Sequence, residues 1–181
     1  MLSELRTRKF TALFACFDHD KNGVLEKIDY EHFAHNLSQA YALVPGSTKY
    51  AAMYADTMAL WEFVHHVADK DGDHRITPAE FIDAYAAMTN DEATFQQLLM
   101  SYAEYVIRTG DRDQDGKLNE DEYATILWCY GIPDADARAA FRHLVTDGSG
   151  YLTTAAMEKV FAEFFRSDDP NAPGNWMIGP V

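Results

Sequence analysis

The amino-acid sequence predicts an all-α fold of four helix–loop–helix units with short paired β-strands between neighbouring loops. Three observations predict this fold. Four short acidic, glycine-containing segments recur along the chain, at residues 18–29, 69–80, 111–122 and 145–156. Apolar residues with the i, i+3, i+4, i+7 spacing of a buried helix face flank each segment. An aliphatic residue stands at the same place in all four segments, where neighbouring loops can pair as strands.

The predicted helices lie on both sides of each segment. Proline and glycine break the chain between units, at Pro45-Gly46 and at Gly131-Ile132-Pro133. Thr77 and Asn119 each stand three residues before a glutamate, which predicts helix N-caps, and we expect Asn90 to cap the helix before the third segment. The apolar stripes consist of Phe10, Leu13, Phe14 and Phe17; Tyr30, Phe33, Leu37 and Tyr41; Met53, Leu60, Trp61 and Val64; Phe81, Tyr85 and Met88; Phe95, Leu98, Leu99 and Tyr102; Tyr123, Ile126 and Leu127; Phe141 and Leu144; and Val160, Phe161 and Phe164.

Composition argues against several classes of partner. The 181 residues carry 29 Asp and Glu against 15 Lys and Arg, for a formal net charge of −14. A surface this negative repels phosphate backbones and anionic lipids, so we expect no nucleic-acid and no membrane partner and instead expect cations. We find no signal-like or membrane-spanning apolar segment, and Cys16 and Cys129 are expected to be free thiols. These features predict a cytoplasmic protein.

The third segment has every feature of a twelve-residue calcium loop. Ca²⁺ takes about six to eight oxygens, from loop positions 1, 3, 5, the carbonyl at 7, position 9 and a bidentate acid at 12. Position 6 favours glycine because the chain turns sharply there, as at Gly116. The predicted ligands are Asp111, Asp113, Asp115, the carbonyl of Lys117, Asn119 and Glu122.

The second segment departs from this pattern at position 6, where His74 replaces glycine and Gly72 stands two places earlier. A non-glycine residue in the left-handed region costs on the order of 1 kcal/mol, although histidine is among the more tolerant types. We expect Ca²⁺ binding to survive this replacement, and whether His74 weakens the site is left open. The predicted ligands are Asp69, Asp71, Asp73, the carbonyl of Arg75, Thr77 and Glu80.

The first segment carries an aspartate, Asp29, where the third has a glutamate at position 12. Aspartate is one methylene shorter and binds in a bidentate manner only if the following helix moves inward, while the longer Glu26 at position 9 can compensate. This combination favours six-coordinate geometry, so we expect Mg²⁺ to compete with Ca²⁺ here. The predicted ligands are Asp18, Asp20, Asn22, the carbonyl of Val24, Glu26 and Asp29.

The fourth segment lacks most of the required oxygens. Val145 and Ala156 occupy positions 1 and 12, and Asp147 is its only charged ligand position. We therefore expect this loop to bind no ion and to act as the structural partner of the third loop.

The three loops identify the chain as an EF-hand protein with four hands. It resembles the sarcoplasmic calcium-binding protein branch, which includes calerythrin-like proteins, in Glu26 and Asp29 at positions 9 and 12, in the long spacing between the first two loops, in total length and in its P-G-N-W ending. The resemblance implies two hand pairs in one globule, with one or two hands silent. We accordingly expect an N-terminal pair over residues 1–90, a C-terminal pair over 91–166 and a tail over 167–181.

The tail contains an apolar run, Trp176-Met177-Ile178, which would be adhesive if exposed. We therefore expect the tail to dock on the body and to fill the apolar groove between hands that a sensor opens to a target.

These features predict reversible Ca²⁺ binding at three sites, in a cytoplasmic calcium buffer or carrier. Two alternatives remain open: a sensor that exposes an apolar groove to a target protein, and a binding protein for an apolar, luciferin-like molecule, since aromatic residues make up 13% of the chain. A protein target is not required, and we expect a monomer. The seven histidines form no H-E-x-x-H motif, so we interpret them as structural or solvated, and we predict no enzymatic activity.

Overall fold

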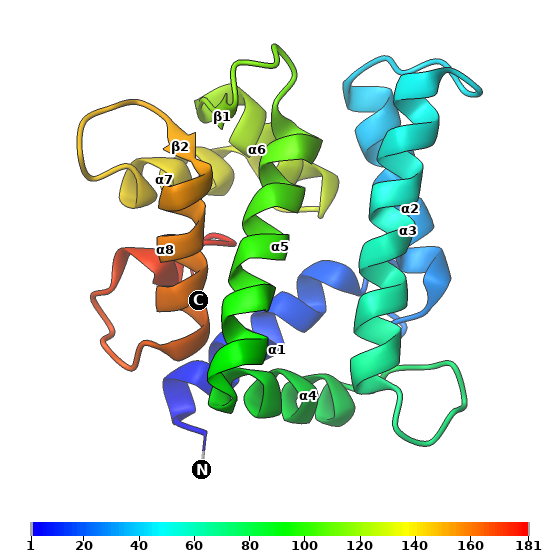
Figure 1. The fold of residues 1–181 in the computed structure, drawn as a ribbon, viewed down its shortest axis with the longest axis vertical. Coiled ribbons are helices and arrows are strands. Elements are labelled where there is room, and N and C mark those ends of the chain that lie inside the picture. Colours follow the sequence, from blue (N-terminus) through cyan, green and yellow to red (C-terminus); the bar gives the residue numbers. More distant parts are fainter. Residues whose placement is uncertain (1, 181) are drawn as a thin grey trace.

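Eight α-helices and one short 3₁₀ turn occur within residues 2–180, the part of the chain that this computed structural model describes (Figure 1). The all-α prediction is therefore confirmed. The helices are α1 (Glu4–Phe17), α2 (Lys27–Ala40), α3 (Thr48–Ala68), α4 (Pro78–Asn90), α5 (Glu92–Gly110), α6 (Glu120–Cys129), α7 (Asp134–Leu144) and α8 (Thr154–Arg166), and the 3₁₀ turn η1 (Pro173–Trp176) follows α8.

Local capping sets the start of α4 and of α6 as predicted. The Thr77 side chain accepts a hydrogen bond from the N–H of Glu80, and the Glu80 carboxylate accepts one from the N–H of Thr77. Asn119 and Glu122 form the same reciprocal arrangement at α6. Both capping boxes satisfy N–H groups that the first helical turn leaves without partners.

The prediction for Asn90 is wrong by one residue. Helix α4 continues through Asn90, and Asp91 is the N-cap of α5, where its carboxylate accepts a hydrogen bond from the N–H of Thr94 at 2.8 Å. Asparagine and aspartate are nearly equal as N-caps, and an anionic cap also interacts favourably with the positive end of the helix dipole. Residue type alone therefore could not decide whether Asn90 or Asp91 is the N-cap of α5.

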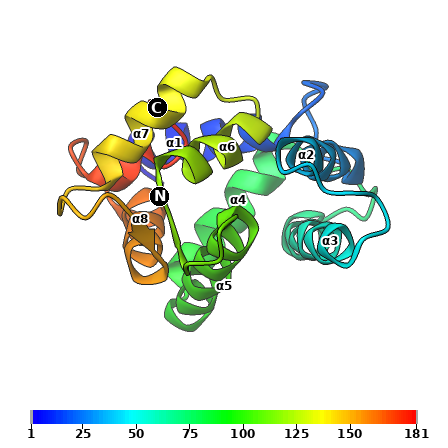
Figure 2. The ribbon, with the colours of Figure 1, turned by 90° about the horizontal axis from the view of Figure 1, so that it is seen from above.

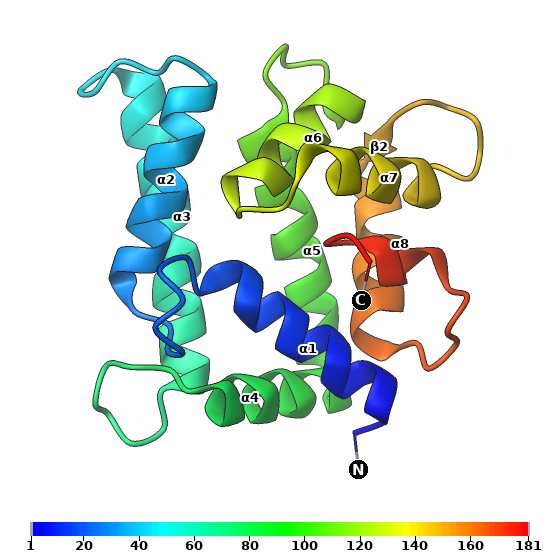
Figure 3. The ribbon, with the colours of Figure 1, turned by 180° about the vertical axis from the view of Figure 1, so that it is seen from behind.

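The helices pack as neighbouring pairs. Helix α2 packs on α3, α5 on α8 and α6 on α7, while α1 crosses the molecule diagonally and packs on α4 and α8 (Figures 1 and 3). Seen from above, α2 and α3 lie side by side at one edge of the molecule (Figure 2). The loops at 18–29 and 69–80 lie at one end of the molecule, and those at 111–122 and 145–156 at the other (Figure 3). None of the helices in residues 2–180 is both long enough and apolar enough to cross a bilayer.

Short strand pairing joins neighbouring loops, as predicted. Strands β1 (Lys117–Leu118) and β2 (Leu152–Thr153) are antiparallel, with Leu118 opposite Leu152. Leu25 and Ile76 form an isolated antiparallel bridge, with N–H···O distances of 2.8 and 3.0 Å. All four aliphatic residues are essentially inaccessible to solvent. Each pairing therefore connects two neighbouring loops through main-chain hydrogen bonds and anchors them in the core.

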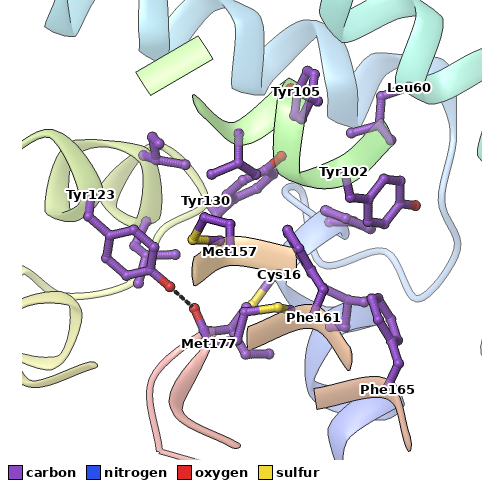
Figure 4. Close-up of a pocket in the computed structure, with 16 residues that line it drawn as sticks. Cys16, Leu60, Tyr102, Tyr105, Tyr123, Tyr130, Met157, Phe161, Phe165 and Met177 are labelled. Carbon is purple, nitrogen blue, oxygen red and sulfur yellow. Dashed lines mark hydrogen bonds between the residues drawn. The ribbon is translucent and has the colours of Figure 1, made fainter. Parts of the chain in front are cut away.

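An apolar cavity of about 70 Å³ lies in the core, among residues of α1, α5, α6, α8 and the tail (Figure 4). Aromatic side chains dominate its lining, which includes Tyr102, Tyr105, Tyr123, Tyr130 and Phe161. Elements from both ends of the sequence therefore line the cavity.

The tail after α8 turns back onto the body. Turn η1 packs against α7 and α8. The Trp176 ring stacks on His143, with ring centroids 3.8 Å apart and planes 9° from parallel. The Tyr123 hydroxyl donates to the carbonyl oxygen of Met177, and the Met177 side chain lines the cavity (Figure 4). The tail therefore packs on the helices of the body and forms part of the apolar core.

Lys9 is a fully buried cation that ties α1 to the tail. Its Nζ donates to the side-chain oxygen of Asn175 at 3.1 Å and to the carbonyl oxygens of Ser167 at 2.8 Å and Glu163 at 3.2 Å. Burial lowers the pKa of Lys9 to about 8. The three acceptors explain how a lysine is tolerated on the buried face of α1.

Alkaline pH is expected to destabilise the fold through its buried tyrosines. Burial raises the pKa of each, to about 12 for Tyr105, and the list comprises Tyr30, Tyr85, Tyr102, Tyr105 and Tyr123. The folded state keeps protons that the unfolded state loses, so each tyrosine should lower the free energy of unfolding by about 1.4 kcal/mol per pH unit above about pH 10.

Lys9 has the opposite effect on the free energy of unfolding, because its pKa is lower in the folded state than in the unfolded state. It adds stability as the pH rises from about 8 to 10.5, but it is one group against five. Urea unfolding at fixed calcium, between about pH 8 and pH 11, measures this profile. A free energy of unfolding that stays constant above pH 10 would show that the tyrosines ionise equally well in the folded state.

Candidate metal centres

The third loop joins α5 to α6, and its carboxylates converge. One oxygen from each of Asp111, Asp113 and Glu122 lies within 4.8 Å of the other two. Asp111 is the C-cap of α5, and its oxygens accept N–H bonds from Asp115 at 3.1 Å and from Gly116 at 2.8 Å. Glu122, buried in the first turn of α6, closes the loop by accepting N–H bonds from both of its arms.

The first loop, between α1 and α2, shows the same convergence with a shorter closing acid. Oxygens of Asp18, Asp20 and Asp29 lie within 4.8 Å of one another. Asp29 is only 1% exposed and accepts N–H bonds from both arms of the loop, so its shorter side chain still faces the loop. Glu26 Oε2 accepts a hydrogen bond from Asn22 Nδ2 at 3.1 Å, so the position-9 carboxylate reaches across the loop.

The second loop, between α3 and α4, gathers three of its four acidic side chains. Oxygens of Asp69, Asp71 and Asp73 lie within 4.8 Å of one another. Glu80 accepts hydrogen bonds from the N–H of Lys70 at 3.3 Å, from the N–H of Thr77 at 2.9 Å and from the Thr77 hydroxyl at 2.7 Å. It therefore links both arms of this loop, as Glu122 does in the third loop.

The remaining predicted ligands stand at corresponding places in the three loops. The position-7 residues Val24 and Arg75 directly precede the bridged pair Leu25 and Ile76, and Lys117 lies in β1 opposite Thr153. The position-9 residues, Glu26, Thr77 and Asn119, are the N-caps of α2, α4 and α6. Position 9 therefore ends the loop and begins the exiting helix in each hand.

The fourth loop, between α7 and α8, holds no comparable group. In the part of the chain that the structure describes, no three His, Cys, Asp or Glu side chains converge between Val145 and Ala156. Asp147 accepts a hydrogen bond from the N–H of Ser149 at 2.9 Å, and this bond stabilises the turn. Loop four nevertheless contacts loop three, because Lys117 Nζ lies 3.7 Å from the Tyr151 ring centroid as well as in the strand pairing.

The loops share a backbone feature that the sequence reasoning missed. Position 4, as well as position 6, has a left-handed backbone in every loop. The φ angles at position 4 are 60° (Lys21), 78° (Gly72), 63° (Gln114) and 73° (Gly148), and at position 6 they are 86° (Gly23), 64° (His74), 84° (Gly116) and 78° (Gly150). Gly72 is therefore not a displaced position-6 glycine. The signal was present in the sequence, since the second and fourth loops both carry glycine at position 4.

Burial and N–H donors act in opposite directions on the loop carboxylates. Burial raises the pKa of Asp29, although main-chain N–H donors partly offset this effect. Burial also opposes ionisation of Asp69, but there the loop N–H groups prevail and lower the pKa. The N–H and hydroxyl of Thr77 lower the pKa of Glu80. Carboxylate oxygens that converge within a few ångströms suit a hard dication that prefers oxygen ligands.

Similarity to characterised proteins agrees with this chemistry. The EF-hand domain pair family matches residues 72–127, which include the whole third loop and most of the second. Calerythrin of Saccharopolyspora erythraea is 26% identical over 155 residues, covering 84% of this chain and 88% of calerythrin. Sarcoplasmic calcium-binding protein 1 of Astacus leptodactylus is 27% identical over 181 residues, covering 91% of this chain and 90% of that protein.

Two solved structures extend the comparison. A Streptomyces coelicolor calcium-binding protein, described in connection with prokaryotic calcium-mediated regulation, has a TM-score of 0.74 and 29% identity over 88% of this chain and 97% of its own. The calcium-loaded apo form of Renilla muelleri coelenterazine-binding protein has a TM-score of 0.80 at 16% identity, over 99% of this chain and 100% of its own, and so shares the fold. With the acidic loops and the four helix–loop–helix units, these similarities identify an EF-hand protein that resembles calerythrin and the sarcoplasmic calcium-binding proteins.

Proposed function

We propose that this EF-hand protein binds three Ca²⁺ ions, at residues 18–29, 69–80 and 111–122, and acts as a monomeric cytoplasmic calcium buffer or carrier. The observation that carries the proposal is the convergence of carboxylate oxygens in these three loops. The eighteen residues predicted as ligands remain the proposed ligand set, and the fourth hand is a silent partner of the third. Three bound dications reduce the formal charge from −14 to −8, which relieves the repulsion between clustered acids.

The position of the tail supports a buffer over a sensor. A calcium sensor presents an apolar groove to a partner helix when its hands open. Here Met177 and Ile178 line the central apolar cavity, and the Tyr123 hydroxyl bonds to the Met177 carbonyl. The chain's own tail thus covers apolar surface that a target would need.

The size of the cavity argues against the small-molecule alternative. The coelenterazine-binding protein shares this fold, and the cavity described here is apolar and rich in aromatic side chains. Its volume of about 70 Å³ is well below the roughly 300–1,000 Å³ of pockets that hold drug-sized ligands. Occupation by a luciferin-like molecule would require the aromatic side chains to move apart.

Calorimetric titration of metal-free protein with Ca²⁺ tests the number of sites. We expect three ions per chain, and two for Glu122→Gln, because that substitution removes one negative charge and the bidentate acid of the third loop. The matched control is Asp147→Asn in the fourth loop, which should still bind three. Fewer than three ions in the unmodified protein, or a loss in the control, would contradict the assignment.

Mg²⁺ competition is expected to depend on the acid at position 12 of the first loop. Replacing Asp29 by Glu adds a methylene, allows bidentate binding and should raise the preference of this loop for Ca²⁺ over Mg²⁺ at least about tenfold. The reciprocal change, Glu122→Asp, should lower that preference in the third loop. Calcium titrations with and without Mg²⁺ measure both effects. Equal Mg²⁺ competition in all three proteins would rule out side-chain length as the cause.

A further inference from the structure

We propose that His65, Asp69 and His74 form a second type of metal site, which takes a Zn²⁺-class ion beside the second calcium loop. His65 lies in the last turn of α3, Asp69 is the C-cap of α3 and His74 occupies position 6 of the loop. One ligand atom from each of these residues lies within 4.8 Å of the other two. Neutral imidazole is the commonest protein ligand for zinc and related ions, whereas Ca²⁺ and Mg²⁺ prefer oxygen alone.

The three ligand atoms are spaced for such an ion. His65 Nε2 lies 3.0 Å from His74 Nδ1 and 3.0 Å from Asp69 Oδ2, and His74 Nδ1 lies 3.9 Å from Asp69 Oδ2. These three separations scatter around the roughly 3.3 Å that separates ligand atoms in a tetrahedral zinc site with bonds of about 2.0 Å. Three protein ligands leave a fourth position for water.

The side chains of Asp69 and His65 are mostly buried, whereas that of His74 is exposed to solvent. The Asp69 side chain is 4% exposed and that of His65 is 22% exposed, while His74 is 79% exposed and gives the ion access from solvent. The His65 ring lies 5.1 Å from the Trp61 ring and is nearly parallel to the His74 ring, with an interplanar angle of 13°. The acidic protein attracts dications to this surface.

The backbone gives the second, independent reason to single out His74. Position 6 is left-handed in all four loops, and the other three place glycine there. A histidine at this position accepts the strain of a left-handed backbone and places an imidazole against His65. Asp69 has two carboxylate oxygens, so Oδ2 can serve the imidazole site while Oδ1 remains for the calcium loop.

Zinc titration of the calcium-saturated chain tests this proposal, because Ca²⁺ then occupies the oxygen cages. We expect one Zn²⁺ per chain by calorimetry, and at least a tenfold loss of affinity in both His65→Ala and His74→Gly. Cobalt in place of zinc should give the visible absorption of a four-coordinate ion, and both variants should lose it. His74→Gly restores the glycine of the other loops, so a calcium titration with the same number of sites and no loss of affinity verifies that the loop is intact.

The matched control is His66→Ala, which removes the exposed histidine next to His65 and should leave zinc affinity unchanged. Absence of zinc uptake by the unmodified protein would overturn the site. Equal affinity in the unmodified protein and in the His65 and His74 variants would overturn it as well, as would an equal loss in the His66 control.

Discussion

Removing calcium is expected to lower the free energy of unfolding by about 12 kcal/mol relative to a solution in which free Ca²⁺ is about 1,000 times the dissociation constant. An ion that binds only the folded state contributes about 4 kcal/mol per site under these conditions, and three sites are proposed. The physical reason is the clustering of charge: twelve of the 29 acidic residues stand at ligand positions, four in each loop. Without cations these groups repel one another at short range.

Urea unfolding with calcium and with a calcium chelator measures this increment. Glu122→Gln should reduce the increment by about one third, since it removes one site of three. Asp147→Asn changes the fourth loop by the same chemistry and should leave the increment unchanged. An increment that is equally large in Glu122→Gln would mean that the third loop does not hold an ion.

Deleting residues 167–181 is expected to expose the apolar core and to destabilise the calcium-loaded protein by on the order of 5 kcal/mol. Burial of a large apolar side chain contributes about 1.5–3 kcal/mol, and Met177 is buried while Trp176 and Ile178 are partly buried against the body. The deletion also leaves the buried Tyr123 hydroxyl and the Lys9 ammonium short of partners. Binding of an apolar fluorescent dye should rise several-fold in the presence of calcium.

A milder variant tests the role of the tail even if the truncated chain does not fold. Met177→Ser keeps the tail but removes its contribution to the cavity lining, and it should raise dye binding to a smaller extent. Asn171→Ser, in the exposed turn before η1, is the control and should change neither quantity. Unchanged dye binding in both the deletion and the Met177 variant would show that the tail covers no apolar surface.

Local residue patterns predicted the hands, because the determinants of each hand lie close together in sequence. An N-cap and its N3 acid are three residues apart, as at Thr77 and Glu80, and the loop acids alternate along one turn. The pairing of Leu25 with Ile76 followed from their equivalent positions in two repeats. These features require no knowledge of how distant helices pack.

Contacts between distant segments could not be predicted in this way. Lys9 is predicted from the sequence to be an ordinary charged residue of an amphipathic helix, and only α8 and the returning tail supply the oxygens that permit its burial. His65 and His74 are nine residues apart, and their approach depends on a left-handed backbone at a position where sequence patterns expect glycine.

The main-chain pairing between loops also bears on how the ions influence one another. The Leu25–Ile76 bridge connects two loops that each carry acids, so ordering one loop reduces the entropy that the other must lose, and we expect positive cooperativity between the first and second ions. The β1–β2 pair connects the third loop to one without the acids to bind a dication. The binding isotherm of the third ion should therefore be hyperbolic and independent of the other two ions, because the strand pairing already orders the third loop.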